Sequence, residues 1–186
     1  MLNTIQTLDF QILDAIQNTL RCAFLDRLMP AVSALGNYGI LWIAIALLFL
    51  IWKKRRACGA HLAAGLIGGV LIGNVLLKHL VARPRPCWIN SGIELLINNP
   101  TDYSFPSGHT LAATIAAAIL FHSDRLLGIP AVILAAMIAF SRLYLYVHFP
   151  SDVIAAVALG LFIAFAVIRL AAAYRGKCGT TQRSCA

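Results

Sequence analysis

Long apolar segments dominate this chain and constrain its fold more than any other feature of the sequence. Hydrophobic residues make up 60% of the 186 positions and charged residues only 12%, with a mean hydropathy of +0.82. This is too apolar for an ordinary soluble domain of its size, whereas a membrane protein can leave such surface facing lipid. Because backbone polar groups inside a bilayer must be paired within the chain, apolar segments of about 20 residues predict transmembrane helices. The sequence therefore predicts one all-α integral membrane protein.

The apolar segments predict a bundle of about five to six transmembrane helices. Spans can be placed at about residues 28–52, 59–80, 110–121, 127–146 and 152–170. The third span looks short for a full crossing unless the turn before it is also buried. A Gly-Asn-Tyr-Gly sequence at 36–39 is expected to interrupt the first span. Glycines in the second span are expected to let neighbouring helices approach closely, at Gly65, Gly68, Gly69 and Gly73.

Both ends of the chain are predicted to lie outside the membrane domain, which we place at residues 25–174. Residues 1–24 have an amphipathic pattern, with apolar residues on one helical face and polar residues such as Asp9 elsewhere. This pattern predicts a helix lying in the membrane interface. Residues 175–186 form a basic tail. Because cytoplasmic segments are enriched in lysine and arginine, this tail and the Lys-Lys-Arg-Arg run at 53–56 are predicted to be cytoplasmic.

Neither the charge nor the cysteines of the chain indicate nucleic acid or metal. The formal net charge is +8, but the basic residues are scattered at segment ends and form no stripe interleaved with aromatic residues. The five cysteines show no metal-ligand spacing, so we predict neither a disulfide framework nor a zinc site. No cofactor and no bound metal are expected. The N-terminus lacks the basic start and cleavage site of a removable signal peptide, so none is expected.

Three polar clusters far apart in the sequence are predicted to meet at one face of the membrane. They occupy residues 78–85, 106–109 and 141–152. Counting spans from the cytoplasmic run at 53–56 puts all three at the outer face. Ionisable residues in membrane helices are energetically costly, so they usually mark a functional site. The clusters are therefore candidates for one shared site.

The residue types in these clusters suit a phosphate group. A Pro-Ser pair at 150–151 favours a helix start, which puts Asp152 in the first turn and lets its carboxylate reach His148. Such a contact fixes the tautomer and leaves the other ring nitrogen free to attack. A second helix start offers backbone N–H groups to an anion at Gly108 and His109, and the second histidine can protonate a leaving oxygen. The cations available to neutralise phosphate oxygens, in place of a magnesium ion, are Lys78, Arg83, Arg85 and Arg142.

In residue type, spacing and order, the clusters resemble the three-part signature of the type 2 phosphatidic acid phosphatase (PAP2) family, relatives of the vanadium haloperoxidases. The matching sequences are Lys78-x6-Arg85-Pro86, Pro106-Ser107-Gly108-His109 and Ser141-Arg142-x5-His148-x3-Asp152. No position departs from the family pattern. The resemblance implies a PAP2/haloperoxidase-like helical core and a lipid phosphatase activity.

The resemblance also implies a role for each signature residue. His148 would be the nucleophile that forms a phosphohistidine, Asp152 would orient it, and His109 would be the general acid. The residues implied to bind phosphate are Lys78, Arg85, Ser107, Gly108 and Arg142. Arg83 lies outside the signature, and either a contact to a second phosphate or lipid headgroup, or a surface cation, fits the sequence. An ion pair between Arg142 and Asp152 that joins two helices is the structural alternative for those two residues.

The reaction that the resemblance implies is metal-independent hydrolysis of a membrane lipid phosphate or diphosphate. We expect cleavage of undecaprenyl diphosphate to undecaprenyl phosphate and inorganic phosphate, at the extracytoplasmic side of the plasma (inner) membrane. The alternatives are a phosphatidic acid, phosphatidylglycerol phosphate or lipid A phosphatase, and a lipid phosphotransferase that uses another acceptor. The membrane composition argues against a haloperoxidase, and the histidine pair argues against a protein that only binds anionic lipid. The expected partners are the lipid substrate and the bilayer, with the oligomeric state left open.

Overall fold

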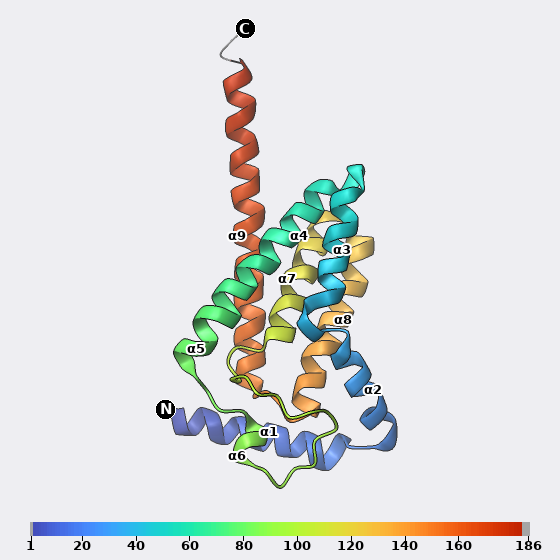
Figure 1. Ribbon diagram of the computed structural model, residues 1–186, viewed down its shortest axis with the longest axis vertical. Coiled ribbons are helices and arrows are strands. Elements are labelled where there is room, and N and C mark those ends of the chain that lie inside the picture. The colour runs from blue at the N-terminus through green and yellow to red at the C-terminus, as the bar shows by residue number, and fades with distance from the viewer. Residues whose placement is uncertain (1, 184–186) are drawn as a thin grey trace.

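A computed structural model describes residues 2–183, with the side chains of residues 4–174, and this part of the chain is entirely helical apart from its connections (Figure 1). In chain order the elements are α1 (Leu2–Leu20), α2 (Ala23–Ala34), η1 (Asn37–Gly39), α3 (Ile40–Ile51), η2 (Lys53–Arg55), α4 (Arg56–Gly69), the π-helical η3 (Val70–Leu77), α5 (Lys78–Val81), α6 (Pro86–Ile89), α7 (Gly108–Ser123), α8 (Arg125–Tyr144) and α9 (Pro150–Arg183). The predicted all-α fold is confirmed. The predicted basic tail, residues 175–186, lies outside the residues whose side chains are described.

Four helical stretches in the described chain are long and apolar enough to cross a membrane, and a fifth apolar helix is shorter. The four are Ala23–Ile51, Lys53–Ile89, Arg125–Tyr144 and Pro150–Tyr174. The shorter helix is α7, with 16 residues. The turn before α7 is buried, as its length required, because Ser104 and Ser107 have no exposed surface. The five predicted spans therefore correspond to these five helical stretches.

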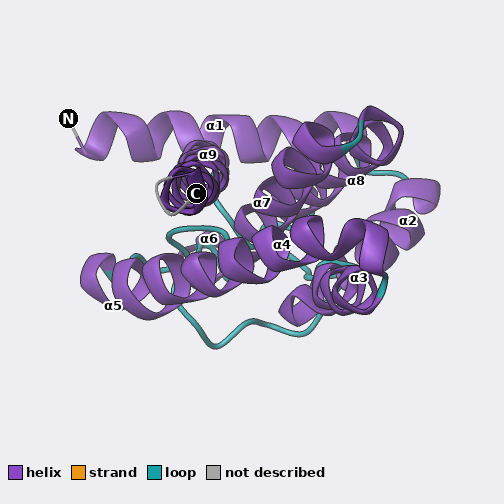
Figure 2. Ribbon diagram, turned by 90° about the horizontal axis from the view of Figure 1, so that it is seen from above, coloured by secondary structure: helices purple, strands orange, loops and turns teal. Residues whose placement is uncertain are grey.

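The short helix α7 runs through the middle of the bundle, between α4, α8 and α9 (Figures 1 and 2). Its small residues make this possible, since Ala113 and Ala116 are fully buried against the neighbouring helices. The central position of α7 has a consequence for function. Because the helix begins at Gly108, it places the half-buried His109 at one end of the bundle.

Two of the predicted close approaches between helices are confirmed on α4. A Cβ atom at Gly65 or Gly69 would lie 2.7 Å from a side-chain carbon of Ile115 on α7. Neighbouring helices can therefore come together only because these side chains are absent. At Gly68 a Cβ would lie 3.5 Å from Ile163 of α9, which is an ordinary contact. Packing therefore does not require a glycine at this third position.

The first span is interrupted where the sequence predicted. Between α2 and α3 the chain makes the short turn η1, in which Tyr38 and Gly39 have φ angles of +53° and +66°. Glycine adopts such a conformation without steric cost, and the turn redirects the chain. The same turn carries Asn37 to the start of α7, where it meets His109.

The N-terminal helix α1 lies across the end of the bundle where α7 and α9 begin (Figure 1). One side of this helix is open, with Leu8 57% exposed and Ile12 39% exposed. The other side is covered by the protein, with Leu13 fully buried and Asp9 3% exposed. The predicted amphipathic helix is present, and its location in the membrane interface stays a prediction.

Candidate active site

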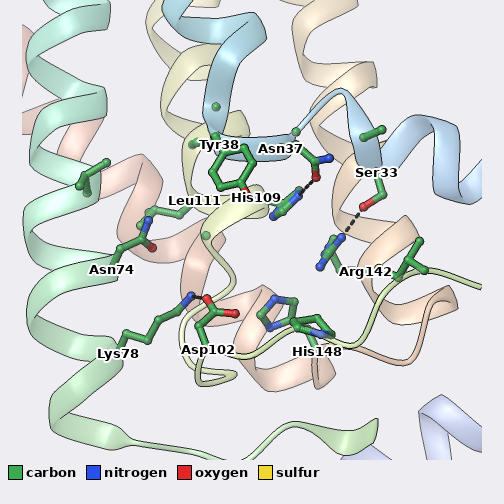
Figure 3. Close-up of a pocket in the computed structure, with 18 of the residues that line it drawn as sticks. Ser33, Asn37, Tyr38, Asn74, Lys78, Asp102, His109, Leu111, Arg142 and His148 are labelled. Atoms are coloured by element: carbon green, nitrogen blue, oxygen red, sulfur yellow. Dashed lines mark hydrogen bonds and ion pairs between the residues drawn. The ribbon is translucent and has the colours of Figure 1, made fainter. Parts of the chain in front are cut away.

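A cavity of about 970 Å³ lies at the end of the bundle where α7 begins (Figure 3). Its wall is built from α2, η1, α3, α4, η3, α5, α7 and α8, from the connections before and after α6, and from the connection that follows α8. The sequence-predicted site residues on the wall are Lys78, Arg85, Gly108, His109, Arg142 and His148. The other two, Ser107 and Asp152, are fully buried outside the cavity lining. The three signature segments therefore converge on one site.

The connection between α8 and α9 holds His148 in the interior. Residues 145–149 are all buried, so their backbone groups need partners inside the protein. The N–H of Val147 donates to the carbonyl of Arg142 at 3.3 Å, and the carbonyl of Val147 accepts from Arg85 at 2.7 Å. The guanidinium of Arg85 thereby connects the signature segment at 78–85 to the loop of the segment at 141–152.

The predicted helix start after His148 is present, with Asp152 in the first turn of α9. The first residue of α9 is Pro150, so Ser151 lies inside the first turn and does not precede the helix. Asp152 supplies the cap, because its Oδ2 accepts the N–H of Phe149 at 3.0 Å. An acidic residue that reaches back across the first turn is a known way to satisfy a free N–H.

The predicted contact between His148 and Asp152 is indirect. The distance from Nδ1 of His148 to Oδ2 of Asp152 is 3.8 Å, beyond a hydrogen bond. The hydroxyl of Ser104 contacts both groups, at 3.4 Å from Nδ1 and 2.5 Å from Oδ2. Since a carboxylate only accepts, Ser104 donates to Asp152 and accepts from Nδ1. Ser104 comes from an irregular segment, and nothing in its spacing could have indicated this position.

The other ring nitrogen of His148 faces a cation. Nη1 of Arg85 lies 3.1 Å from Nε2. A guanidinium can only donate, so Nε2 carries a lone pair and the ring proton is on Nδ1. Burial first, and then the charges of Arg85 and Arg142, lower the pKa of His148 well below its ordinary value of 6.5. The ring is therefore neutral, with its unprotonated nitrogen toward Arg85, which lines the cavity beside it.

The second histidine lines the same cavity from the first turn of α7. Nε2 of His109 lies 2.9 Å from Oδ1 of Asn37 (Figure 3). An amide oxygen accepts, so this contact assigns the proton of His109 to Nε2. Asn37 was not predicted as a site residue, although the turn that carries it was.

Two of the three cations on the wall share one carboxylate. Asp102 forms ion pairs with Lys78 and with Nη2 of Arg85, the second at 2.7 Å. Its side chain is 53% exposed, whereas the two cations are buried. Burial raises the pKa of Asp102, but hydrogen bonds to Lys78 and Arg85 and their charges hold it well below the usual range. Asp102, like Ser104 and Asn37, was not predicted from the sequence.

The third cation, Arg142, has no carboxylate partner in the part of the chain whose side chains are described. It is 4% exposed, donates to the hydroxyl of Ser33 and leaves its Nε without a partner. The structural alternative of an ion pair with Asp152 is therefore wrong. A buried guanidinium that faces a cavity without a counter-ion is suited to bind an anion.

The Ser107–Gly108 turn contributes backbone more than side chain. The hydroxyl of Ser107 lies 3.0 Å from that of Thr110 and is not on the cavity wall. Gly108 does line the cavity, and a Cβ there would lie 3.0 Å from Oδ1 of Asn74. The glycine thus avoids crowding Asn74 at the start of α7, where free backbone N–H groups are suited to an anion. The expected role of the Ser107 hydroxyl as a direct phosphate ligand stays a prediction.

Arg83 does not face the cavity. Its guanidinium pairs with Asp9 at 2.7 Å and with Asp152 at 2.6 Å, and its side chain is 19% exposed. Neither suggestion made from the sequence, a headgroup contact or a surface cation, describes this position.

No group of three or more His, Cys, Asp or Glu side chains in the described chain is placed to hold a metal ion. Metal independence of the reaction stays a prediction.

The chain belongs to the PAP2 superfamily, whose family model matches residues 62–175. An undecaprenyl-diphosphatase of Sulfolobus acidocaldarius is 36% identical over 149 residues, covering 80% of this chain and 71% of the relative. A decaprenylphosphoryl-5-phosphoribose phosphatase of Mycobacterium tuberculosis is 36% identical over 155 residues, covering 78% and 83%. The crystal structure of a transmembrane PAP2-type phosphatidylglycerolphosphate phosphatase from Bacillus subtilis superposes with a TM-score of 0.75 at 26% identity, covering 90% of this chain and 86% of that one. The predicted family and class of enzyme, a PAP2 lipid phosphatase of a multi-pass membrane type, are confirmed.

Proposed function

We propose that this protein hydrolyses a membrane lipid diphosphate without a metal ion, through a phosphohistidine at His148. The observation that carries the proposal is the buried guanidinium of Arg142, which has no carboxylate partner in the described chain and faces the cavity that holds His148 and His109. A bound phosphate would supply the missing negative charge. Binding an anion needs neither histidine, whereas phosphoryl transfer uses a nucleophile and an acid.

The first step transfers the phosphoryl group to the protein. When the phosphate binds, the guanidinium of Arg85 donates to its oxygens instead of to Nε2 of His148. The lone pair on Nε2 then attacks phosphorus. The N–P bond forms as the bond between phosphorus and the leaving lipid phosphate oxygen breaks. His109, protonated on both ring nitrogens at this step, gives that oxygen the proton of Nδ1 and keeps the proton of Nε2, which it donates to Asn37. The groups that neutralise the non-bridging oxygens are Lys78, Arg85, Arg142 and the N–H of Gly108.

The second step returns the protein to its starting state. A water molecule attacks the phosphorus of the phosphohistidine, and His109 now accepts the proton of that water. The N–P bond breaks, inorganic phosphate leaves, and His148 is neutral again. Throughout, the proton of Nδ1 stays on the ring of His148 and is donated to the hydroxyl of Ser104, which in turn donates to Asp152. The carboxylate of Asp152 thereby stabilises the positive charge that the ring carries while it is phosphorylated.

Undecaprenyl diphosphate is the proposed substrate. Its support comes from the Sulfolobus relative of that name and from the cavity wall, which combines the cations with apolar residues of α3, α4 and η3, among them Ile43, Leu66 and Val70. Such a wall accommodates an isoprenoid chain beside a charged headgroup. Phosphatidylglycerol phosphate is the competing substrate because of the Bacillus structure. A preference of less than about tenfold between them, about 1.4 kcal/mol, would overturn the choice.

The site is proposed to face the extracytoplasmic side of the plasma (inner) membrane. The turn between α3 and α4, which contains Lys53–Arg55 and precedes Arg56, lies at the end of the bundle away from the cavity (Figure 1). Basic residues at span ends favour the cytoplasmic side. The cavity then belongs to the opposite side.

Phosphate release from undecaprenyl diphosphate, measured in detergent with EDTA present, tests the proposal. We expect the parent protein to be active, and His148→Ala and His109→Ala each to lose at least about a hundredfold in kcat. A matched control is His122→Ala, at the far end of α7, which should match the parent. Equal activity in the parent and His148→Ala would contradict the proposal, and abolition by EDTA would contradict its metal-free form.

A further inference from the structure

The carboxylate of Asp152 is held on both of its oxygens. Oδ2 accepts from Ser104 and from the N–H of Phe149, as described above. Oδ1 accepts from Nη1 of Arg83 at 2.6 Å. The same Nη1 contacts the hydroxyl of Ser151 at 2.7 Å. The orientation of Asp152 therefore depends on the direction in which the guanidinium of Arg83 points.

That direction is set by the N-terminal helix. Nη2 of Arg83 donates to Oδ2 of Asp9 at 2.7 Å. Asp9 also accepts the N–H of Ser151 at 2.9 Å and its hydroxyl at 2.5 Å. One carboxylate of α1 therefore binds both the guanidinium and the first turn of α9.

Aromatic contacts close the same arrangement. The guanidinium of Arg83 lies over the ring of Phe149, with 3.9 Å from its central carbon to the ring centre. Phe10, next to Asp9 on α1, packs edge-on against Phe149 with 5.2 Å between ring centres. A guanidinium fixed by two carboxylates and an aromatic face has little freedom to rotate.

Burial of these charges costs free energy, which points to a function for the arrangement. Asp9 is 3% exposed on a helix with one open side, and Asp152 is fully buried. Two carboxylates share one guanidinium, so the network includes an excess of buried negative charge. An apolar residue at position 9 would join α1 to the bundle at lower cost.

We propose that Asp9 and Arg83 are positioning residues for the nucleophile. They hold Oδ1 of Asp152, so that Oδ2 stays aligned with Ser104 and, through it, with Nδ1 of His148. The N-terminal helix is then part of the active site, although it lies outside the family signature and outside residues 62–175. The inference rests on the proposed function, in which His148 attacks phosphorus.

The test compares two carboxylates on the same helix. Asp9→Ala removes the contact to Arg83, whereas Asp14→Ala removes a matched contact from α1 to the hydroxyl of Tyr146, 2.8 Å long, that does not reach Asp152. In the undecaprenyl diphosphate assay with EDTA, we expect Asp9→Ala to lower kcat by about tenfold or more, with KM within about twofold of the parent. Asp14→Ala should leave both constants within about twofold of the parent values.

A second measurement separates positioning from a general structural role. If Asp9 acts only through Asp152, Asp9→Ala should lower kcat less than about twofold when added to Asp152→Asn. If Asp9→Ala does not fold, Arg83→Gln replaces it in the same comparison, measured in the parent protein and in Asp152→Asn. Equal losses in both backgrounds, or a raised KM with unchanged kcat, would overturn the inference. Should His148→Ala match the parent in this assay, the proposed function itself has failed; an inactive His148→Ala beside a fully active Asp9→Ala refutes only the positioning role.

Discussion

The ring of His148 lies between a guanidinium and a hydroxyl, and these two contacts determine which nitrogen carries the proton. Arg85 donates to Nε2, and Ser104 accepts from Nδ1. Because the pKa of His148 is lowered by burial and by the charges of Arg85 and Arg142, the neutral form persists below the ordinary value of 6.5. The nitrogen that we propose as the nucleophile is thus unprotonated before any substrate arrives.

This state can be observed directly by ¹⁵N NMR of histidine-labelled protein in detergent, with His148→Ala used to assign the signal. A lowered pKa means that protonation occurs only as the pH falls below 6.5. We expect the ring of His148 to stay neutral, with its proton on Nδ1, as the pH is lowered through that value. A titration midpoint at or above 6.5, or a proton on Nε2, would contradict the assignment.

Asp102 forms ion pairs with two cations, Lys78 and Arg85, that are proposed to bind phosphate. Its ion pairs with Lys78 and Arg85 must be broken or shared when an anion enters. Since the side chain of Asp102 is 53% exposed, these pairs are screened by solvent and are worth about 1 kcal/mol or less. The carboxylate can therefore act as a displaceable counter-ion.

Removing that carboxylate should strengthen inhibition by inorganic phosphate. For Asp102→Asn we expect the inhibition constant for phosphate to fall by up to about fivefold, the equivalent of about 1 kcal/mol. Asp124→Asn is the control, because Asp124 pairs with Arg55 at the other end of α7 and should not affect phosphate. An unchanged or higher inhibition constant in Asp102→Asn would show that Asp102 positions the cations and does not compete for them.

At the scale of elements, the hairpin of α3 and α4 depends on one glycine that faces backbone. A Cβ at Gly59 would lie 2.6 Å from the amide nitrogen of Leu50 and 2.9 Å from the carbonyl oxygen of Ala46. Backbone atoms cannot move aside as a flexible side chain can, so the two helices would have to separate. Gly68, on the same helix, has room for a methyl group.

Alanine at these two positions should therefore have opposite effects on stability. Gly59→Ala is expected to lower the free energy of unfolding by about 1–3 kcal/mol, the usual range for overpacking. Gly68→Ala should be neutral or raise it by up to about 1 kcal/mol, because alanine favours a helix over glycine. Thermal unfolding in detergent measures both. Equal loss in the two variants would mean that α3 and α4 are not in the described contact.

The helices, and the histidines and cations of the cavity wall, could be predicted from the sequence, but the groups that hold the proposed catalytic side chains in place could not. Apolar length and the spacing of signature residues located both histidines and the three cations of the wall, because these lie on helices or in the connections next to them. Ser104 and Asp102 come from an irregular loop without periodicity, so no pattern marks them. Asp9 belongs by pattern to the polar side of an amphipathic helix, and only tertiary packing buries it.

At the scale of the whole molecule, the basic run at residues 53–56 and the cavity lie at opposite ends of the bundle. Arg55 pairs with Asp124 at the end where α3 joins α4 and α7 joins α8, and the cavity lies at the other end (Figure 1). Cys22 is exposed at the junction of α1 and α2, on the cavity side. The orientation of the molecule in the membrane can therefore be read from the accessibility of one native thiol.

In intact cells, with the other four cysteines replaced by serine, a membrane-impermeant maleimide should label Cys22. A cysteine introduced by Lys54→Cys, in a background that lacks Cys22, should be labelled only after permeabilisation. These results are expected because the basic end is proposed to be cytoplasmic. The reverse pattern would place the cavity at the cytoplasmic side and contradict the proposed orientation.

The central claim is that the phosphoryl group passes through His148 before it reaches water, and the stereochemical course at phosphorus tests it most directly. A lipid diphosphate made chiral at its terminal phosphorus with sulfur and ¹⁸O is hydrolysed in ¹⁷O-labelled water, and the configuration of the released thiophosphate is determined. Each in-line displacement inverts phosphorus, so two successive displacements should give overall retention. Inversion would mean that water attacks the lipid substrate directly, and the phosphohistidine mechanism would be wrong.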